Sequence, residues 1–237
     1  MIIPSRLNRR QTIQLLGMSS IGYLLGSCDN STLAKRLGNF SEPLNQSFEE
    51  LLVKSQQLIP EFPKSSIDPK ALIINTYDET PEIDLDTYRL IIDGEVEHPI
   101  ELSLSQLKKL PHSSIVMQHV CVEGWAAIVQ WGGVRLRDLA TLVKPKQSVR
   151  YAIFQSADEY YESWDLASAL HPQTLLADSK NGLPLPIDNG APLRLAAPIK
   201  LGYKQSKWVT QVTFSSQIPP GRKGYWEDQG YEWFAGI

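Results

Sequence analysis

From residue 67 onward, the sequence is an irregular succession of short strand-like and helix-like segments. Runs of β-branched and aromatic residues bounded by turn residues predict strands at 88–92, 114–122, 151–154 and 208–214. Leucines at helical spacing predict short helices at 104–110, 136–142 and 166–170. The order does not alternate strictly between strand and helix, and no segment repeats. We therefore predict an α+β domain with mixed β-sheets and short helices.

Charge and hydropathy exclude two classes of protein. The 237 residues carry 23 basic and 26 acidic side chains, a formal charge of −3, with no block of like charge. A nucleic-acid-binding surface needs a basic patch, so nucleic acid is not an expected partner. No apolar run reaches the ~20 residues that a membrane-spanning helix needs, which excludes a polytopic membrane protein.

The first 28 residues differ from the rest of the chain. Arg9 and Arg10 precede an uncharged stretch at 15–27, and Cys28 follows at once. Basic residues before a short apolar segment are typical of a signal peptide, and the paired arginines resemble the twin-arginine export signal. The residues before Cys28 resemble a lipobox. We predict that residues 1–27 are a signal peptide, and that the exported protein is held on the periplasmic side of the membrane by a lipid on Cys28. The alternative is a cytosolic protein with an amphipathic N-terminal helix.

Composition also suggests how the remaining chain is divided. Residues 28–66 are rich in Ser, Asn, Gln and Pro, apart from an amphipathic patch at 48–58. Such a composition is typical of a tether, here ending in an arm that lies on the domain. We predict that residues 67–237 form a single domain, which is an ordinary size.

Cys121 is the residue with the clearest chemical potential. The sequence has no GxGxxG, GxxxxGK[ST], GxSxG, HExxH or CxxC motif. His119 and Cys121 stand two apart on a predicted strand and so share a face, but two ligands are too few for a zinc site. A lone thiolate suits a transition metal whose other ligands belong to a cofactor. The alternatives are a small buried hydrophobe, a thiol redox residue, or a cysteine nucleophile whose partners nothing identifies.

A proline-rich stretch contains the second candidate. Residues 183–198 hold four prolines, which predicts a stiff, irregular loop. Arg194 lies in this loop between two leucines, so we expect a cation held in a rigid frame. The alternative is an ordinary surface arginine.

The sequence around Cys121 resembles a known family. His119-Val120-Cys121-Val122-Glu123-Gly124-Trp125 and the following Trp131-Gly132-Gly133-Val134-Arg135-Leu136-Arg137-Asp138-Leu139 are similar to the molybdopterin-binding domain of the sulfite oxidase superfamily. Further similar segments follow in order over about residues 70–230: Asn75–Asp78, Tyr88–Ile100, Phe154–Ser156, His171–Leu185, Asn189–Arg194, Gly202–Trp208 and Gly224–Glu227. The resemblance implies a sulfite-oxidase-type fold and a molybdenum–molybdopterin cofactor.

The resemblance also implies a set of site residues. Cys121 would ligate molybdenum as the catalytic residue. Arg194 would hold the phosphate of the pterin as a bidentate donor, with Lys204 and Lys207 as point charges, while Asn189 would meet its polar edge. The cofactor-binding residues implied in this way are Asn75, Tyr77, Asp78, His119, Ser156, Asn189, Arg194, Lys204, Gln205, Ser206 and Lys207. The alternatives are solvated lysines, core tryptophans and an internally bonded histidine.

Departures from the family pattern bear on the substrate. Sulfite oxidases have an arginine shortly after the ligand cysteine, whereas this chain has Glu123 and then apolar residues. Whether Glu123 faces the metal or points away stays open, as does an approach by Arg89 or Arg150. We predict poor sulfite oxidation and a neutral or larger substrate, with sulfoxide reduction the first reaction to test.

The same departures bear on partners. The resemblance is nearest to bacterial exported members, among them the methionine sulfoxide reductase catalytic subunit. It implies a small-molecule substrate, a monomer without the family's dimerisation domain, and an external electron-transfer partner, either a haem protein or a membrane subunit. The alternatives are a sulfite oxidase or dehydrogenase, and a non-catalytic binding protein that keeps the fold.

Overall fold

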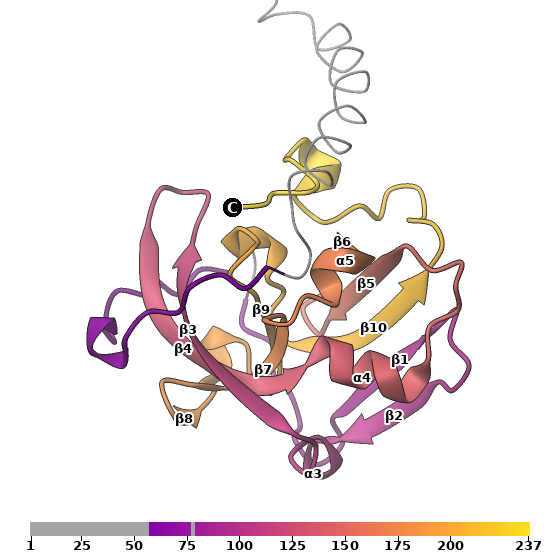
Figure 1. Cartoon of the computed structure of the whole chain (residues 1–237), viewed down its shortest axis with the longest axis horizontal. Coiled ribbons are helices and arrows are strands. Elements are labelled where there is room, and N and C mark those ends of the chain that lie inside the picture. Colours follow the sequence, from indigo (N-terminus) through magenta and orange to yellow (C-terminus); the bar gives the residue numbers. More distant parts are fainter. Residues whose placement is uncertain (1–56, 77–78) are drawn as a thin grey trace, which may run out of the picture. The chain divides into compact units, whose positions relative to one another are not determined.

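A computed structural model describes residues 57–76 and 79–237 (Figure 1). Its first sheet has the strand order β2-β1-β10-β5-β6. The bounds of these strands are β1 (Arg89–Gly94), β2 (Ile100–Ser103), β5 (Tyr151–Ser156), β6 (Tyr161–Asp165) and β10 (Val209–Ser215). Strands β1 and β10 run parallel, and the other neighbours are antiparallel. The sheet is therefore mixed.

The second sheet is antiparallel and carries the candidate site. Its strands are β3 (His112–Val120), β4 (Ala126–Arg135), β7 (Leu175–Lys180), β8 (Leu183–Pro184) and β9 (Arg194–Ala196), with β9 paired to β7. Strands β3 and β4 form the long hairpin seen in Figure 1. A Cβ atom on Gly133 would lie 2.1 Å from the carbonyl oxygen of Leu176, so only glycine lets β7 pair closely with β4 here.

Short helices join the strands. They are α3 (Leu104–Leu107), α4 (Leu136–Val143) and α5 (Leu166–Ala169), and the 3-10 turns are η1 (Lys64–Ser66), η2 (Ile187–Asn189), η3 (Gly202–Lys204) and η4 (Glu227–Gln229). Helix α3 begins with a capping box between Ser103 and Gln106. Helix α4 ends where Lys144 adopts a left-handed conformation.

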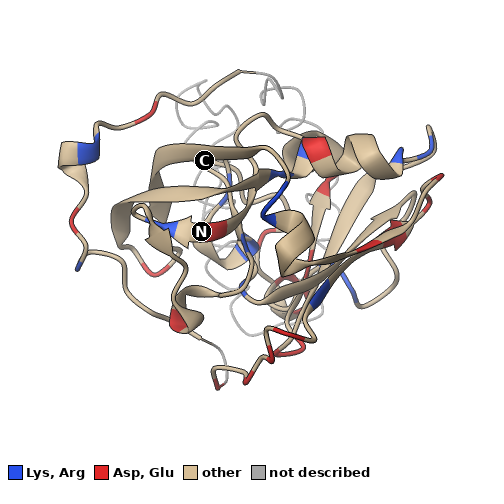
Figure 2. Cartoon of the chain, turned by 90° about the horizontal axis from the view of Figure 1, so that it is seen from below, with Lys and Arg blue, Asp and Glu red and all other residues tan. Residues whose placement is uncertain are grey.

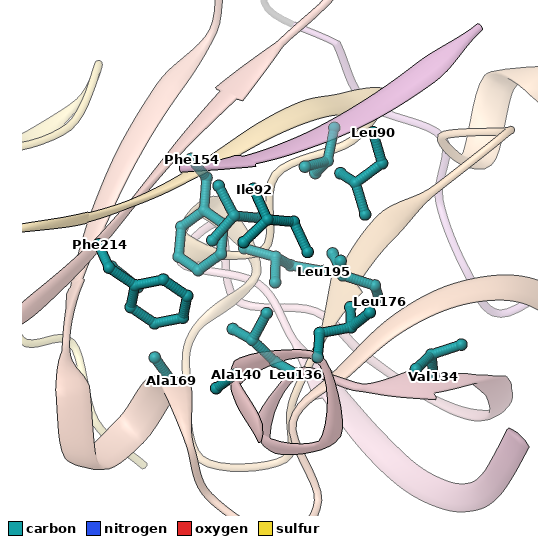
Figure 3. Packing of buried hydrophobic residues seen from close by; sticks show 14 of the residues in the cluster. Leu90, Ile92, Val134, Leu136, Ala140, Phe154, Ala169, Leu176, Leu195 and Phe214 are labelled. Atoms are coloured by element: carbon teal, nitrogen blue, oxygen red, sulfur yellow. The ribbon is translucent and has the colours of Figure 1, made fainter. Parts of the chain in front are cut away.

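The main core joins the two sheets. Figure 3 shows Leu136 and Ala140 of α4 near Ile92 of the first sheet and Leu176 of the second, and all four are buried. Burying a large aliphatic side chain contributes roughly 1.5–3 kcal/mol, so this shared cluster holds the sheets against each other. It thereby fixes the strand ends that carry the candidate site.

The α+β prediction is confirmed, with differences in detail. The strands predicted at 88–92, 151–154 and 208–214 and all three helices are present within a few residues. The strand predicted at 114–122 ends at Val120, because Cys121 already begins a turn. The proline-rich stretch is less irregular than expected, since β8, η2 and β9 lie within it. Arg194 is therefore on a short strand, where backbone pairing with Ala177 overrides the prolines.

The described part of the predicted arm lies on the domain. Ile59 exchanges two hydrogen bonds with the side chain of Gln173, and the amide of Phe62 donates to the carbonyl oxygen of Val116. The predicted signal peptide, Cys28 and most of the predicted tether and of the patch at 48–58 lie outside the described residues. Within the described ranges, no helix combines the length and apolar character needed to cross a membrane.

Charges of both signs are spread along the described chain. Figure 2 shows lysine and arginine interspersed with acidic residues over both sheets and the connecting loops. This agrees with the absence of a like-charge block in the sequence. That nucleic acid is not a partner stays a prediction.

Candidate functional site

Cys121 begins the turn that joins β3 to β4. Its amide donates to the carbonyl oxygen of Trp125 at 2.9 Å, and the amide of Gly124 donates back to the carbonyl oxygen of Cys121 at 3.1 Å. Gly124 has φ +90°, a conformation that suits glycine and closes the turn. Because the strands on both sides are paired along their length, the half-buried thiol is held at a rigid hairpin end.

The carboxylate of Glu123 faces this thiol. Its Oε2 atom lies 3.5 Å from Cys121 Sγ and accepts a hydrogen bond from Trp125 Nε1 at 3.0 Å, while its Oε1 atom accepts one from Asn75 Nδ2 at 3.0 Å. The hydrogen bond from Trp125 is the main cause that lowers the pKa of Glu123. Burial, together with this carboxylate, raises the pKa of Cys121. Of the two orientations left open by the sequence, Glu123 has the one facing the thiol.

His119, on strand β3 two residues before Cys121, is a buried neutral group. Burial lowers its pKa to about 3, and the positive charge of Arg194 adds to the effect. Its ring stacks on Trp125 and meets Trp131 edge-on, with centroid distances of 6.0 and 6.2 Å. Its Nδ1 atom is buried and has no hydrogen-bond partner among the described residues. A Cβ atom on Gly202 would lie 3.0 Å from Nε2 of this ring, so a glycine is needed at that point.

Arg194 is a buried cation without a counter-ion in the described chain. Its guanidinium donates to the carbonyl oxygens of Leu195, Asn189 and Gln205 at 3.1, 3.0 and 3.4 Å. The charge also lies over the ring of Trp131, 4.5 Å from its centroid. Burial lowers the pKa of Arg194 to about 9, so the side chain is still protonated at neutral pH. The alternative of a solvated surface arginine is wrong, because Arg194 is only 5% exposed.

Two lysines extend this positive region. Lys207 donates to the carbonyl oxygens of Asn75 and Asp188 at 2.8 and 3.2 Å, and Lys180 donates to Oδ1 of Asn189 at 2.7 Å. Burial, followed by the charge of Arg194, lowers the pKa of Lys207 to about 8 and also lowers that of Lys180. Three cations thus gather around Asn189, and none forms an ion pair within the described ranges.

Gln205 and Ser206 lie on the loop between η3 and β10. The Gln205 side chain donates to the carbonyl oxygens of Ala197 and Lys200 at 3.1 and 2.7 Å, which fixes the loop. Ser206 Oγ is buried and finds no partner in the part of the chain that the structure describes. A buried hydroxyl without a partner costs free energy, so this atom is expected to meet a ligand.

Most of these side chains, though not Lys180 or Trp131, line one cavity of about 220 Å³. Eight of the residues implied by the family resemblance line it: Asn75, His119, Cys121, Asn189, Arg194, Gln205, Ser206 and Lys207. Other lining side chains were not identified as site residues from the sequence: Thr76, Glu123, Trp125, Asp158, Tyr160, Asp188, Tyr203, Trp208, Trp226 and Tyr231. Several of these stand in motifs similar to the family's, and that was the only signal for them in the sequence.

The other four implied residues are not among the described residues that line this cavity. Tyr77 and Asp78 lie outside the described residues. Ser156 is buried at the end of β5 and does not reach the cavity. Lys204 is not among the lining residues either, and its ammonium lies between the carboxyl groups of Glu162 and Glu227.

The two arginines considered as substitutes for the missing sulfite-oxidase arginine are also elsewhere. Arg89 donates to the carbonyl oxygens of Asp86 and Tyr88, and Arg150 donates to those of Gln147 and Val149. Neither lines the cavity. The side chain nearest Cys121 that carries a charge is therefore an acid.

The donor set fits a molybdopterin. No group of three or more His, Cys, Asp or Glu side chains in the described ranges could hold a metal by itself, so a metal at Cys121 needs ligands from a cofactor. Arg194 and Lys207 supply uncompensated positive charge for a phosphate. The unpartnered atoms His119 Nδ1 and Ser206 Oγ offer hydrogen bonds to a polar ring.

Comparison with known proteins agrees with this chemistry. The family model for the oxidoreductase molybdopterin binding domain matches residues 77–226. A putative protein-methionine-sulfoxide reductase subunit from Azospira oryzae is 38% identical over 237 residues, covering 99% of this chain and 88% of that protein. The protein-methionine-sulfoxide reductase catalytic subunit of Campylobacter jejuni is 32% identical over 157 residues, which is 59% of this chain and 52% of that protein.

A solved structure supports the fold. The sulfane dehydrogenase SoxCD from Paracoccus pantotrophus superposes with a TM-score of 0.59 at 19% identity, covering 72% of this chain and 52% of that one. The chain thus spans about half the length of this protein and of the Campylobacter jejuni relative. The chain belongs to the molybdopterin-binding oxidoreductases of the sulfite oxidase superfamily, and it is an enzyme whose cofactor is a molybdenum–molybdopterin.

Proposed function

We propose that this oxidoreductase reduces a neutral sulfoxide, with Cys121 ligating the molybdenum of the cofactor. The observation that carries the proposal is the pairing of Cys121 with the carboxylate of Glu123, 3.5 Å from the thiol, in a cavity whose free cations lie on Arg194 and Lys207. The cationic region, at Arg194 and Lys207, suits an anionic cofactor. The acidic region, at Glu123, suits a substrate that carries no negative charge.

The cationic region suits the cofactor. The fork of Arg194 can donate two parallel hydrogen bonds to a phosphate. Lys207 adds a point charge that lies against two backbone carbonyls and the ring of Trp208. Asn189, Ser206 and Nδ1 of His119 would meet the polar groups of the pterin. When bound, the cofactor supplies two-electron, oxygen-atom-transfer chemistry.

The acidic region selects the substrate. Sulfite is an anion, and a fixed carboxylate beside the reacting position repels it, whereas a sulfoxide is neutral and is not repelled. The names of two relatives, which refer to protein-methionine-sulfoxide reductase, favour the same reaction. Reduction of a sulfoxide takes up two electrons and two protons, and yields a sulfide and one water molecule.

The electrons must come from outside the cavity. We propose an external redox partner, either a haem protein or a membrane subunit, and a small-molecule or side-chain sulfoxide as substrate. Export through residues 1–27 and a lipid anchor at Cys28 are part of the same proposal, supported by the paired arginines and the segment before the cysteine. Replacing Cys28 by alanine should release the protein from membranes, since each buried acyl methylene contributes about 0.8 kcal/mol.

Metal analysis combined with two assays tests the proposal. Wild-type protein from a molybdenum-competent host should contain near-stoichiometric molybdenum, reduce an alkyl sulfoxide with an artificial electron donor, and oxidise sulfite poorly. Cys121→Ser should lose molybdenum and activity together. Metal-free wild-type protein would indicate a binding protein that keeps the fold. A kcat/KM for sulfite above roughly 10⁵ M⁻¹s⁻¹, within the ordinary enzyme range, would identify a sulfite-oxidising enzyme instead.

The contribution of Glu123 can be tested separately. Glu123→Gln keeps the size and one of the two acceptor oxygens but removes the charge, so sulfite oxidation should improve relative to sulfoxide reduction. Asp188→Asn is a control that removes a carboxylate from another part of the cavity lining. An unchanged ratio of the two activities in Glu123→Gln would remove the charge-selection argument.

A further inference from the structure

A buried cluster of ionisable side chains lies beside the cavity and takes no part in the reaction proposed above. Nζ of Lys204 is 2.5 Å from Oε1 of Glu162 and 2.5 Å from Oε1 of Glu227, and it donates to the carbonyl oxygen of Ser163 at 3.2 Å. The three charged side chains are 0% exposed. All three protons of the ammonium therefore have acceptors in the protein.

Each member of the cluster adjoins a residue of the cavity wall. Glu162 follows Tyr160 by two positions, Lys204 follows Tyr203 directly, and Glu227 follows Trp226 directly. All three of these aromatic residues line the cavity. The cluster thus ties together three segments that are far apart in sequence, and each segment presents an aromatic ring to the cavity.

The segment at 224–236 depends most on these contacts, because it contains only the short turn η4. Gly224 forms a bridge with Glu162, and a Cβ atom on it would lie 2.0 Å from Oε2 of Glu227. Further along, Trp233 Nε1 donates to Ser163 Oγ at 2.9 Å, and Nζ of Lys200 donates to the carbonyl oxygen of Phe234 at 2.5 Å. Backbone bonds at the two ends of the segment, from Tyr225 to Tyr161 and from Leu201 to Ala235, and these side-chain contacts between them hold it in place.

The aromatic rings on this wall form a continuous surface. The ring of Tyr231 lies 5.3 Å from Trp226 and 5.4 Å from Tyr203, measured between centroids. Tyr231 is 42% exposed, so the surface extends from the cavity to its mouth. Aromatic faces attract polarised methyl groups and sulfur atoms, and a sulfoxide presents both.

We propose that Lys204, Glu162 and Glu227 act as a positioning cluster, which holds residues 224–236 in place so that Trp226 and Tyr231 bind the carbon substituents of the sulfoxide. The inference rests on the proposed sulfoxide reduction. Burial raises the pKa of Glu162 well above its usual range. The cluster contacts no reacting atom, and its effect on catalysis passes through the aromatic wall.

The test compares two variants of Glu227, whose contact with Lys204 holds the segment next to Trp226. Glu227→Ala removes this contact, whereas Glu227→Gln keeps a hydrogen-bond acceptor for the ammonium. Two readouts are used on the loaded enzyme: kcat and KM for dimethyl sulfoxide and for methyl p-tolyl sulfoxide, and amide hydrogen exchange over 224–236. Leu139→Ala is the control, because it makes a cavity in the core at α4 and leaves the cluster intact.

Glu227→Ala should exchange faster over 224–236, and its KM for the tolyl sulfoxide should rise about fivefold, or about 1 kcal/mol, with kcat and molybdenum content near wild type. Tyr231→Ala should raise the same KM without changing the exchange of the rest of the segment. Glu227→Gln should restore both quantities, and Leu139→Ala should change neither.

Faster exchange in Glu227→Ala with an unchanged KM would overturn the role of the wall in substrate binding. Unchanged exchange would overturn the positioning role of the cluster, and so would a Glu227→Gln variant as impaired as the alanine variant. If wild-type enzyme turns over no sulfoxide, the proposed function fails, whereas hydrogen exchange still tests the positioning of the segment.

Discussion

Arg194 and Lys204 are buried cations ten positions apart in the sequence, and their surroundings are opposite. Arg194 donates to three backbone carbonyls, has no ion pair in the described chain, and lines the cavity. Lys204 lies between two carboxylates and does not line it. Burying a charge without a counter-ion is costly, whereas a paired charge is compensated within the fold. The comparison favours a ligand-binding role for Arg194 and a structural role for Lys204.

Lys204→Met should have the largest effect on stability. The variant leaves Glu162 and Glu227 buried without their cation, and breaking a buried pair in this way costs about 3–5 kcal/mol. Guanidinium unfolding of the cofactor-free protein measures the change. Lys144→Met, which removes an exposed pair with Glu97, should stay near the wild-type value. A loss below about 1 kcal/mol for Lys204→Met would contradict the structural assignment.

Arg194→Ala should have the opposite effect, with a large loss of cofactor affinity and little loss of stability in the cofactor-free protein. It removes a buried charge that the cofactor-free fold does not compensate, so the stability of that form should not fall through loss of an ion pair. Its affinity for the cofactor should weaken by about 2–5 kcal/mol, as expected when one partner of a buried charge pair is removed. Molybdenum and pterin content of the isolated protein measure this.

Arg150→Ala is the matched control for that variant. Arg150 also donates to backbone carbonyls, but it is exposed and distant from the cavity lining. Its cofactor content should equal that of wild type. A fully loaded Arg194→Ala protein would mean that another group binds the phosphate.

Lys207 offers a pH-dependent test of the same comparison. Burial lowers its pKa from 10.5 to about 8 in the cofactor-free protein. Between these pH values the unfolded chain binds more protons than the folded one, so this lysine makes folding more favourable as pH rises from about 8 to about 10.5. The stability of wild type relative to Lys207→Met should therefore rise across this window.

The bound cofactor should reduce that rise. An anionic phosphate near Lys207 favours its charged form and returns its pKa toward the ordinary value. Chemical unfolding of both proteins, with and without cofactor, at several pH values measures the difference. A rise of equal size in loaded protein would place the phosphate away from this lysine.

The smallest effect is expected for Glu162→Gln. Burial raises the pKa of Glu162 and so favours its neutral form, which glutamine resembles. The stability change should be below about 1 kcal/mol, while Glu162→Ala should cost more because it leaves a void and removes an acceptor. A loss as large as that of Lys204→Met would show that both carboxyls of the cluster are charged.

Local signals predicted much of the fold. Leucine spacing located α4, and a β-branched run located β10, because amphipathic periodicity depends only on neighbouring residues. Strand β9 was missed, since it exists through pairing with β7, and the prolines on either side of it predicted a loop. The same limit applied to the site. Cys121 and Arg194 were identified from their motifs, but Trp226 and Tyr231 reach the cavity from a distant part of the chain.

The sequence by itself determined the mixed fold class, the family, and Cys121 as the candidate site residue, because each depends on residue type and local order. Only the tertiary structure decided which of the buried cations have a carboxylate counter-ion. Lys204 and Lys207 are three positions apart in one motif, and the sequence alone does not distinguish their environments. Their roles differ because Glu162 and Glu227, from two other segments, lie against the first and not the second. A counter-ion acts through distance in space, and the order of residues does not record that distance.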